Sequence, residues 1–422
     1  MLLLTLAKRN LWRNKKRTSI TLLLIACSVA AMMMTHGLIE GTKTSMVHSA
    51  TRLFPGDGQV HLKDYHLSRD TELRFNYLEI LNYLQQQLEV AAITPRIYER
   101  AMISSTSNAL NIQMVAVEPK QETQVSKLAD AIINGTMLKN NDKNSTDILI
   151  GSKLAEKLEV KLGDRVVLSA AKLLEEGSEI SQGLFRVSGI VQFNAQQMDK
   201  NWVYIPLARA QSMLGMENQA HELAFNINPD AFSSHLNQDE FLALAFWQNI
   251  KKEIQQFNRD VNVRNWPELL PELNAMLSMT DTSLFITGLI LFIIAMLGMV
   301  NTLFMSIYER MWEFAVIKAI GNTPAQIFLM IVMEGLLLAI WGIVLGVFLG
   351  TFGNAWIAHV GIDYSNMEFA GAAIVEPIRS EFHIVQYIHV PIFSLLLILI
   401  SCIYPARFAS KIVPAGALHK SL

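Results

Sequence analysis

The chain has 422 residues, of which 51% are hydrophobic and 17% are charged, and its mean hydropathy is +0.28. A soluble chain of this length is usually less apolar and more charged, so the composition indicates a membrane protein. The formal net charge of −2 argues against a nucleic-acid partner, which requires a basic surface. Both cysteines, Cys27 and Cys402, lie in apolar runs, so the polar middle of the chain has no disulfide, thiolate nucleophile or cysteine-type zinc site.

Residues 1–17 are predicted to form an amphipathic helix on the membrane surface. Apolar residues recur at helical spacing at Leu4, Ala7 and Leu11. The basic residues of the same segment form a stripe: Arg9, Arg13 and Arg17. One interpretation is an elbow helix that moves with the first span. The alternative is that these charges only fix the topology and bind anionic lipid.

Residues 18–40 contain the first apolar run that is long enough to cross a bilayer, which takes about 20 residues. The sequence Leu24–Cys27 fits a lipoprotein-type cleavage box. The apolar run continues about a dozen residues beyond Cys27, however, which a signal segment does not need. We therefore expect a retained transmembrane helix.

Residues 41–281 are polar enough to form a large outer domain of mixed α and β structure. The most specific pattern is a strand, a short helix, a Gly163–Asp164 turn and a second strand over residues 147–170. Further elements are expected as strands at "DGQVHL", "NIQMVAV" and "HELAFNI", a helix over 71–88, a glycine-broken strand over 184–193, a strand that feeds a helix at Pro206 within 201–215, and a helical stalk over 266–279 that leads into the second span.

The outer domain shows no catalytic signature. The chain contains no H-E-x-x-H, G-x-S-x-G or P-loop motif. His61, Asp64 and His66 have metal-binding side chains, but on a strand His61 and His66 point to opposite faces. We therefore expect a solvated surface there, no metal site and no enzyme activity.

Residues 282–308 form the second predicted span, and residues 309–324 form a short, strongly polar connection to the third. Good helix formers continue to residue 320, and Gly321 or Asn322 can take the left-handed position that ends a helix. Thr323 can cap the next helix, with Pro324 at its first position. The connection should therefore contain a short helix at the membrane face. Some of its side chains are too apolar for free solvent and require membrane or a docked protein: Met311, Phe314, Ala315 and Ile317.

Residues 325–352 form the third predicted span. Gly342, Gly346 and Gly350 lie four residues apart on one helical face, a spacing that allows close helix approach. That face suits either a dimer interface or packing within one chain, and both alternatives stay open. Glu334 is an intramembrane acid and hence a functional candidate. We favour a structural role over proton transfer: a hydrogen bond to a neighbouring helix, or a carboxylate that reaches a wet cleft.

A short loop over 353–383, a fourth span over 384–405 and a tail over 406–422 complete the predicted topology. Positive charge concentrates before the first span, in the 309–324 connection and after the fourth span, which places all three in the cytoplasm. The 353–383 loop carries four acidic residues against a single arginine, Arg379, which agrees with a place outside, with the large domain.

Four sequence patterns resemble one family of membrane proteins. The pattern E-R-x-x-E-F-x-x-x-K-A-I-G after the second span resembles the cytoplasmic coupling segment of FtsX/MacB-like permeases, the transmembrane subunits of type VII ABC transporters. The N-terminal "LAKRNLWRNKKRTSITLLLIA", the closing "YPARFASKIVPAGAL" and the "IGSKLAEKLEVKLGDRVVL" of the outer domain are similar to the corresponding segments of that family. The resemblance covers essentially the whole chain, and lipoprotein-release permeases are among its members.

The resemblance implies a bacterial inner-membrane protein with cytoplasmic termini and a periplasmic MacB-like domain. The connection would dock on a cytoplasmic ABC ATPase dimer, with Phe314 as the hydrophobic anchor and the charges selecting the partner; a lipid-held surface helix is the alternative. The coupling positions implied are Glu309, Arg310, Met311, Glu313, Phe314, Ile317, Lys318 and Gly321. ATP and Mg²⁺ would bind the separate ATPase and not this chain. A second permease, identical or related, and membrane lipids are the other partners implied.

The function implied is a permease subunit that carries ATP-driven motion to its periplasmic domain and moves lipoprotein or lipid-linked cargo out of the inner membrane. A lipoprotein or another periplasmic protein would then be a partner. Three alternatives stay open: export of small amphiphiles or peptides, mechanical regulation of an envelope enzyme without transport, and a membrane-anchored enzyme without an ATPase partner.

Overall fold

The computed structural model of the chain describes residues 15–65, 70–139, 141–173, 177–228, 239–362, 368–369, 372–373 and 377–412. The chain divides into two compact units: Met1–Thr44 with Met276–Asp363 and Pro377–Leu422, and Ser45–Ala275 with Tyr364–Glu376. The predicted surface helix over 1–17 and the tail over 406–422 fall mainly outside the described residues and stay predictions.

The first unit is a bundle of long helices joined by one short helix. Its elements are α2 (Lys15–Leu53, whose last turns belong to the second unit), α11 (Pro271–Glu309), α12 (Met311–Ala319), α13 (Pro324–Val360) and α14 (Ile384–Ser410). Among the described residues, α2, α11, α13 and α14 are long and apolar enough to cross a membrane, so the four predicted spans are confirmed as helices. Each helix extends beyond the predicted span at one or both ends.

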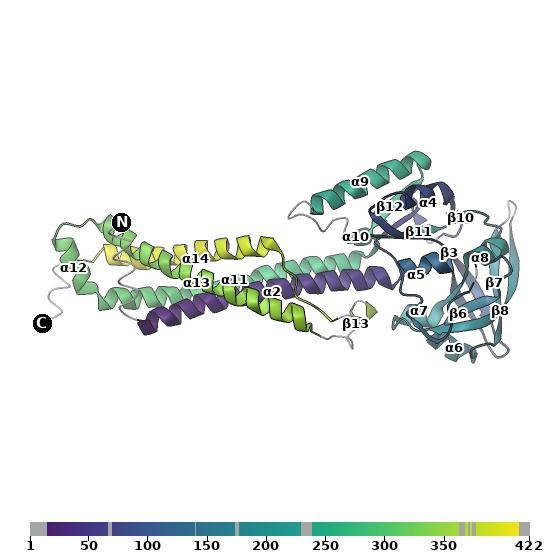
Figure 1. Cartoon of the computed structure of the whole chain (residues 1–422), viewed down its shortest axis with the longest axis horizontal. Helices are drawn as coiled ribbons and strands as arrows, with labels where there is room; N and C mark the ends of the chain where they lie inside the picture. The colour runs from purple at the N-terminus through teal and green to yellow at the C-terminus, as the bar shows by residue number, and fades with distance from the viewer. Residues whose placement is uncertain are drawn as a thin grey trace. The chain divides into compact units, whose positions relative to one another are not determined.

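The helices of the first unit share one apolar core, and Figure 1 shows them running alongside one another. Ile25 of α2, Met299 of α11, Ile331 of α13 and Cys402 of α14 each expose 1% or less of their surface. Apolar side chains also cover much of the outer face of the bundle, as a membrane requires; Phe348 and Ile290, for example, are 70% and 53% exposed.

The second unit contains a ten-stranded mixed sheet in the order β12-β1-β11-β3-β4-β9-β6-β8-β5, with β7 paired to β3 and β8. Its strands are β1 (Gly58–Leu62), β3 (Val90–Ser104), β4 (Ala109–Val117), β5 (Ile132–Gly135), β6 (Asp147–Gly151), β7 (Arg165–Leu173), β8 (Ser178–Val191), β9 (Trp202–Pro206), β11 (Glu222–Ile227) and β12 (Val261–Asn265). A separate two-stranded pair joins β2 (Phe75–Asn76) to β10 (Gln219–Ala220), and another joins β13 (Glu368–Phe369) to β14 (Ala372–Ala373). The helices of this unit are α4 (Leu78–Gln85), α5 (Pro119–Val125), α6 (Ser152–Leu158), α7 (Gln196–Asn201), α8 (Leu207–Leu214), α9 (Asp239–Phe257) and α10 (Trp266–Leu269).

Several predicted elements of this unit are confirmed. The strand–helix–strand unit over 147–170 is β6, α6 and β7, and the strand that feeds a helix at Pro206 is β9 followed by α8. The strands expected at "DGQVHL", "NIQMVAV" and "HELAFNI" are β1, β4 and β11.

Other predictions for this unit are wrong in detail. The helix expected over 71–88 is only α4, because residues 75–76 pair with β10 and Leu88 is 90% exposed beyond the helix end. The glycine-broken strand expected over 184–193 lies within β8, which ends at Val191, and its pairing with β6 shifts register between Val187 and Gly189, at the expected glycine. The helical segment over 266–279 is interrupted at Leu270, between α10 and α11.

The expected solvated surface around His61 is also wrong. His61 is 1% exposed on the inner strand β1, and its ring centroid lies 6.0 Å from that of the buried Tyr65. Asp64 follows β1 in a turn, and His66 lies outside the described residues. Among the residues that the structure describes, no group of three His, Cys, Asp or Glu side chains is arranged to hold a metal ion.

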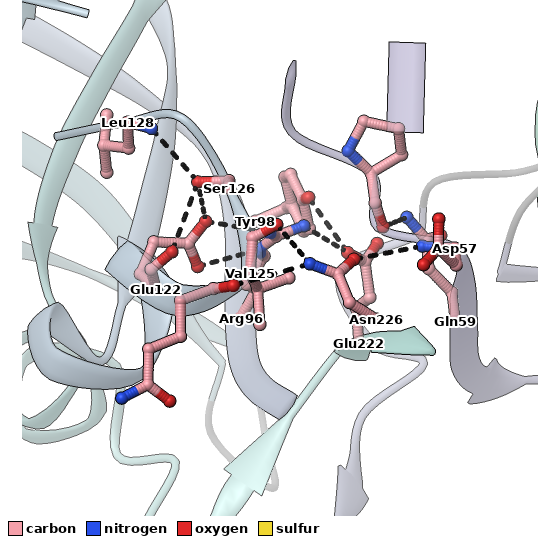
Figure 2. A network of polar contacts seen from close by, with 12 residues as sticks. Asp57, Gln59, Arg96, Tyr98, Glu122, Val125, Ser126, Leu128, Glu222 and Asn226 are labelled. Carbon is pink, nitrogen blue, oxygen red and sulfur yellow. Dashed lines mark hydrogen bonds and ion pairs between the residues drawn. The ribbon is translucent and has the colours of Figure 1, made fainter. Parts of the chain in front are cut away.

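A buried ionic network links β3, β11 and α5 (Figure 2). Arg96 donates from Nη2 and Nε to the two carboxylate oxygens of Glu122, at 2.7 and 3.0 Å, and from Nη1 to Glu222 Oε1 at 3.1 Å. All three side chains are 1% exposed or less, and the guanidinium lies 4.0 Å from the ring centroid of Phe54. Buried charges are tolerated only when paired in this way, so the network fixes the position of α5 on the sheet.

Candidate coupling site

The short helix α12 has the boundaries that its sequence dictates. Helix α11 ends at Glu309, Arg310 takes a non-helical conformation with φ −114° and ψ 16°, and α12 begins at Met311. Gly321 adopts φ +106°, a left-handed conformation that an L side chain rarely takes. Thr323 forms a capping box with Gln326 at the start of α13, and Pro324 occupies the first turn. The predicted short helix and its end signals are confirmed, and Figure 1 shows α12 between the ends of α11 and α13.

One face of α12 is buried in the helical core. Phe314 is 1% exposed and Ala315 is fully buried, and Phe314 packs in the cluster that includes Ile307, Ile327 and Met330. Phe314 was expected to be the hydrophobic anchor for a partner. Its burial argues against that role, because the side chain fills the core of its own chain. Met311 and Ile317, expected at the same interface, are only partly buried.

Arg310 turns inward and forms the polar anchor of α12. Its Nη1 donates to Glu334 Oε2 of α13 at 3.2 Å, and its Nε donates to Glu313 Oε2 at 2.9 Å. The side chains of Arg310 and Glu334 are each 7% exposed, and Ser306 Oγ lies 3.4 Å from Glu334 Oε1. The Arg310 guanidinium also lies 5.0 Å from the Phe314 ring centroid. Glu334 therefore accepts hydrogen bonds from a neighbouring helix, as the favoured interpretation expected.

Two further charged side chains tie the ends of the connection to other helices. Glu309 Oε2 accepts a hydrogen bond from Arg17 of α2 at 2.7 Å. Lys318 Nζ donates to the backbone oxygens of Ser410 and Ile412, at 3.2 and 2.9 Å, at the end of α14. A cation is favourable there because the last carbonyls of a helix carry partial negative charge. The Arg17–Glu309 pair joins the end of α11 to α2, and Lys318 holds α12 against the end of α14. The expected role of Lys318 in partner selection stays a prediction.

The exposed face of α12 carries large apolar side chains that the sequence patterns did not single out. Trp312 is 55% exposed, and Ile320, the residue that caps the end of α12, is 80% exposed. Gly321 is also exposed, and the Glu313 side chain is 37% exposed. Nearly every residue from 311 to 320 is apolar, so no amphipathic pattern separates the two faces. At about 100° per residue, Ile320 lies about 120° from Phe314 and about 140° from Ala315, so helical spacing alone does not separate an exposed face from a buried one.

The glycines of α13 pack against α2 of the same chain. A methyl group built on Gly342 would come within 2.7 Å of Ile25, on Gly346 within 2.7 Å of Val29, and on Gly350 within 3.0 Å of Met33. Distances of this size leave no room for a side chain. The contacts favour packing within one chain over a dimer interface for this face.

Comparison with known protein families matches two family models to this chain, one over each of two long segments. Residues 18–235 match the model for the MacB-like periplasmic core domain, and residues 285–414 match the model for the FtsX-like permease C-terminal domain. The lipoprotein-releasing system transmembrane protein LolE of Haemophilus influenzae is 23% identical over 348 residues, which cover 79% of each chain.

Two other relatives extend over nearly all of this chain. The lipoprotein-releasing system transmembrane protein LolC of Neisseria meningitidis is 21% identical over 431 residues, which cover 96% of each chain. The macrolide export ATP-binding/permease protein MacB of Campylobacter jejuni is 23% identical over 437 residues, which cover 98% of this chain and 61% of that longer protein. The chain is therefore a membrane protein that belongs to the FtsX-like permeases with a MacB-like periplasmic core domain, the ABC transporter permeases of the LolC, LolE and MacB type.

Proposed function

We propose that this permease is driven by a separate ABC ATPase that docks on the exposed face of α12. In this proposal the termini and α12 lie in the cytoplasm, and the MacB-like domain between α2 and α11 lies in the periplasm of a bacterial cell. ATP and Mg²⁺ bind the ATPase dimer, which pairs with two permeases, identical or related. Motion of α12 is passed to the periplasmic domain through the long helices.

The observation that carries the proposal is the two-sided construction of α12. Its inner face is held by the Phe314 packing and by the Arg310–Glu334 pair, whereas Trp312 and Ile320 are 55% and 80% exposed. Exposed apolar side chains beside a carboxylate are typical of a docking surface, where aromatic residues supply most of the binding energy. A push on the outer face would be transmitted to α13, because the inner face is held by packing and a buried ion pair.

Lipoprotein or lipid-linked cargo is the substrate that we propose. The support is that two relatives that align over most of this chain, from Haemophilus influenzae and Neisseria meningitidis, are named lipoprotein-releasing system transmembrane proteins. Reconstitution of the permease with its ATPase in vesicles tests this proposal. ATP-dependent release of a lipid-anchored protein would support it, and ATP turnover without release of cargo would favour a mechanical regulator.

Docking is tested by replacing the exposed apolar side chains. Trp312→Asp and Ile320→Asp should each abolish co-purification of the ATPase, because a carboxylate would be buried at the interface. Trp356→Asp is the matched control, since Trp356 is 62% exposed near the other end of α13. Normal recovery of the ATPase with both α12 variants would contradict the proposed docking surface.

A further inference from the structure

Two adjoining cavities lie in the second unit, on the side of the sheet that carries Tyr98 and Arg100. The first has a volume of about 520 Å³ and the second about 590 Å³. Both volumes are within the range of about 300–1,000 Å³ that is typical of small-molecule sites. Arg100, Gln113, Gln197 and Trp202 line both cavities, so the two form one continuous site.

The first cavity has a mainly aromatic and aliphatic wall. The centroid of the Trp202 ring lies 5.3 Å from that of Phe54 and 6.3 Å from that of Tyr98, and both pairs are edge-to-face. Leu53 and Leu269 complete this wall, and they belong to the segments by which the chain enters and leaves the unit. A wall of this composition favours an apolar chain, because burying it removes hydrocarbon surface from water.

The carboxylate in this wall is already engaged by neighbouring groups. Glu222 Oε1 accepts hydrogen bonds from Arg96 Nη1 at 3.1 Å and from the Tyr98 hydroxyl at 3.2 Å. Figure 2 shows Glu222 turned toward Arg96 and Tyr98, and Gln59 nearby on β1. The negative charge of Glu222 is compensated by these groups, so a ligand in the cavity does not need a positively charged group to pair with it.

Arg100 supplies the charge of the site. It is exposed, and no hydrogen bond or ion pair joins its guanidinium to the residues that the structure describes. It stands where the apolar cavity meets the second cavity, which is lined mainly by polar groups such as Asn111, Gln113, Ser169 and Asn201. A guanidinium presents a rigid set of donors that suits a carboxylate or phosphate.

We propose that these cavities bind an anionic amphiphile with one apolar chain, with the chain in the first cavity and the acidic group at Arg100. The inference goes beyond the proposed function, because it concerns a ligand site in the MacB-like domain that requires neither ATP nor an ATPase. The shared chemistry is a single chain with an acidic head, which a fatty acid and a lysophospholipid both supply.

The test uses the full chain in lipid nanodiscs without ATP. The first probe is hexadecanoic acid with a photoreactive diazirine at the end of its chain, and the corresponding hexadecanol is the neutral control probe. Peptides labelled after illumination are identified by mass spectrometry. We expect saturable labelling by the acid of peptides that contain Leu53 or Trp202. Competition by free hexadecanoic acid and by lysophosphatidylglycerol shows which source of the acidic group binds more tightly.

Two variants separate the roles of shape and charge. Gln197→Trp fills the junction of the cavities from an exposed position and should lower labelling by both probes at least about tenfold, the loss of about 1.4 kcal/mol of binding. Arg100→Gln should weaken labelling by the acid up to about fivefold, as expected for an exposed charge, and leave labelling by the alcohol unchanged. Arg165→Gln, at an exposed arginine on β7 outside both cavities, is the matched control and should change neither.

Two results would overturn the inference. One is labelling that maps only to the long helices of the first unit, as simple partition into the bilayer would give. The other is an Arg100→Gln variant that weakens the acid and the alcohol equally, because an anion-binding role predicts a difference between them. Neither result bears on ATPase docking, so the two proposals fail independently.

Discussion

Replacement of Glu334 by alanine should release α12 from the helical core. The change removes the acceptor 3.2 Å from Arg310 Nη1 and leaves a guanidinium whose side chain is only 7% exposed. Breaking a buried pair by removing one partner typically costs about 3–5 kcal/mol. Arg310 keeps its bond to Glu313 at 2.9 Å and its contact with the Phe314 ring, so the low end of that range applies.

A cost of about 3 kcal/mol corresponds to roughly a hundredfold change in an equilibrium constant. Hydrogen exchange of the α12 amides measures local opening directly, so exchange in Glu334→Ala should be roughly a hundredfold faster than in the parent chain. The double variant Arg310→Met with Glu334→Leu replaces both charges by apolar groups and should restore exchange to within a few fold.

Glu309→Ala is the matched control for this experiment. Glu309 also accepts a hydrogen bond from an arginine, at 2.7 Å, but the side chains of the pair are 21% and 39% exposed. An exposed pair contributes about 0–1 kcal/mol, so exchange should change less than about fivefold. Equal effects of Glu309→Ala and Glu334→Ala, or a double variant as disturbed as Glu334→Ala, would refute the assignment of a buried polar anchor.

Three further predictions concern stability. Arg96→Met should lower the free energy of unfolding of the second unit by about 3–5 kcal/mol, because two buried carboxylates lose their shared partner, whereas Lys143→Met at an exposed pair should change denaturant midpoints little. Burial raises the pKa of Glu99 from its usual 4.5 to about 7, so the folded protein retains a proton that the unfolded chain releases; stability is then lost as pH rises through this window. The thermal unfolding midpoint should therefore decrease as the pH is raised from about 5 to about 8. The same decrease in the Glu99→Gln variant would contradict this cause. Gly346→Leu should lower the thermal unfolding midpoint by separating α13 from α2, because even a methyl group at this position would lie 2.7 Å from Val29. Val344→Leu, at a position that is 58% exposed, should leave that midpoint unchanged.

The long apolar runs and local end signals of this chain could be predicted from sequence, because each depends on residues close together along the chain. Thr323, Pro324 and Gly321 mark the ends of their helices by local chemistry alone. The β6–α6–β7 unit follows from alternating apolar residues and a Gly-Asp turn.

The orientation of side chains on α12 could not be predicted, because it depends on distant partners. Phe314 is buried by residues of α11 and α13, and Arg310 turns inward toward Glu334, 24 residues further along the chain. The Arg96 network is similar, since Glu122 and Glu222 are 26 and 126 residues away and no local pattern marks them. The cavities beside Tyr98 arise where separate strands and loops meet, which the sequence of any one element does not indicate.

Site-specific photocrosslinking from α12 in native membranes tests the central claim most directly. A benzophenone amino acid at position 312 or 320 should crosslink to an ABC ATPase chain, identified by mass spectrometry, and the same group at position 356 should not. Crosslinks from positions 312 and 320 to lipid alone, or labelling of these positions by a membrane-impermeant reagent added from the periplasmic side, would contradict the account of α12 as the docking element.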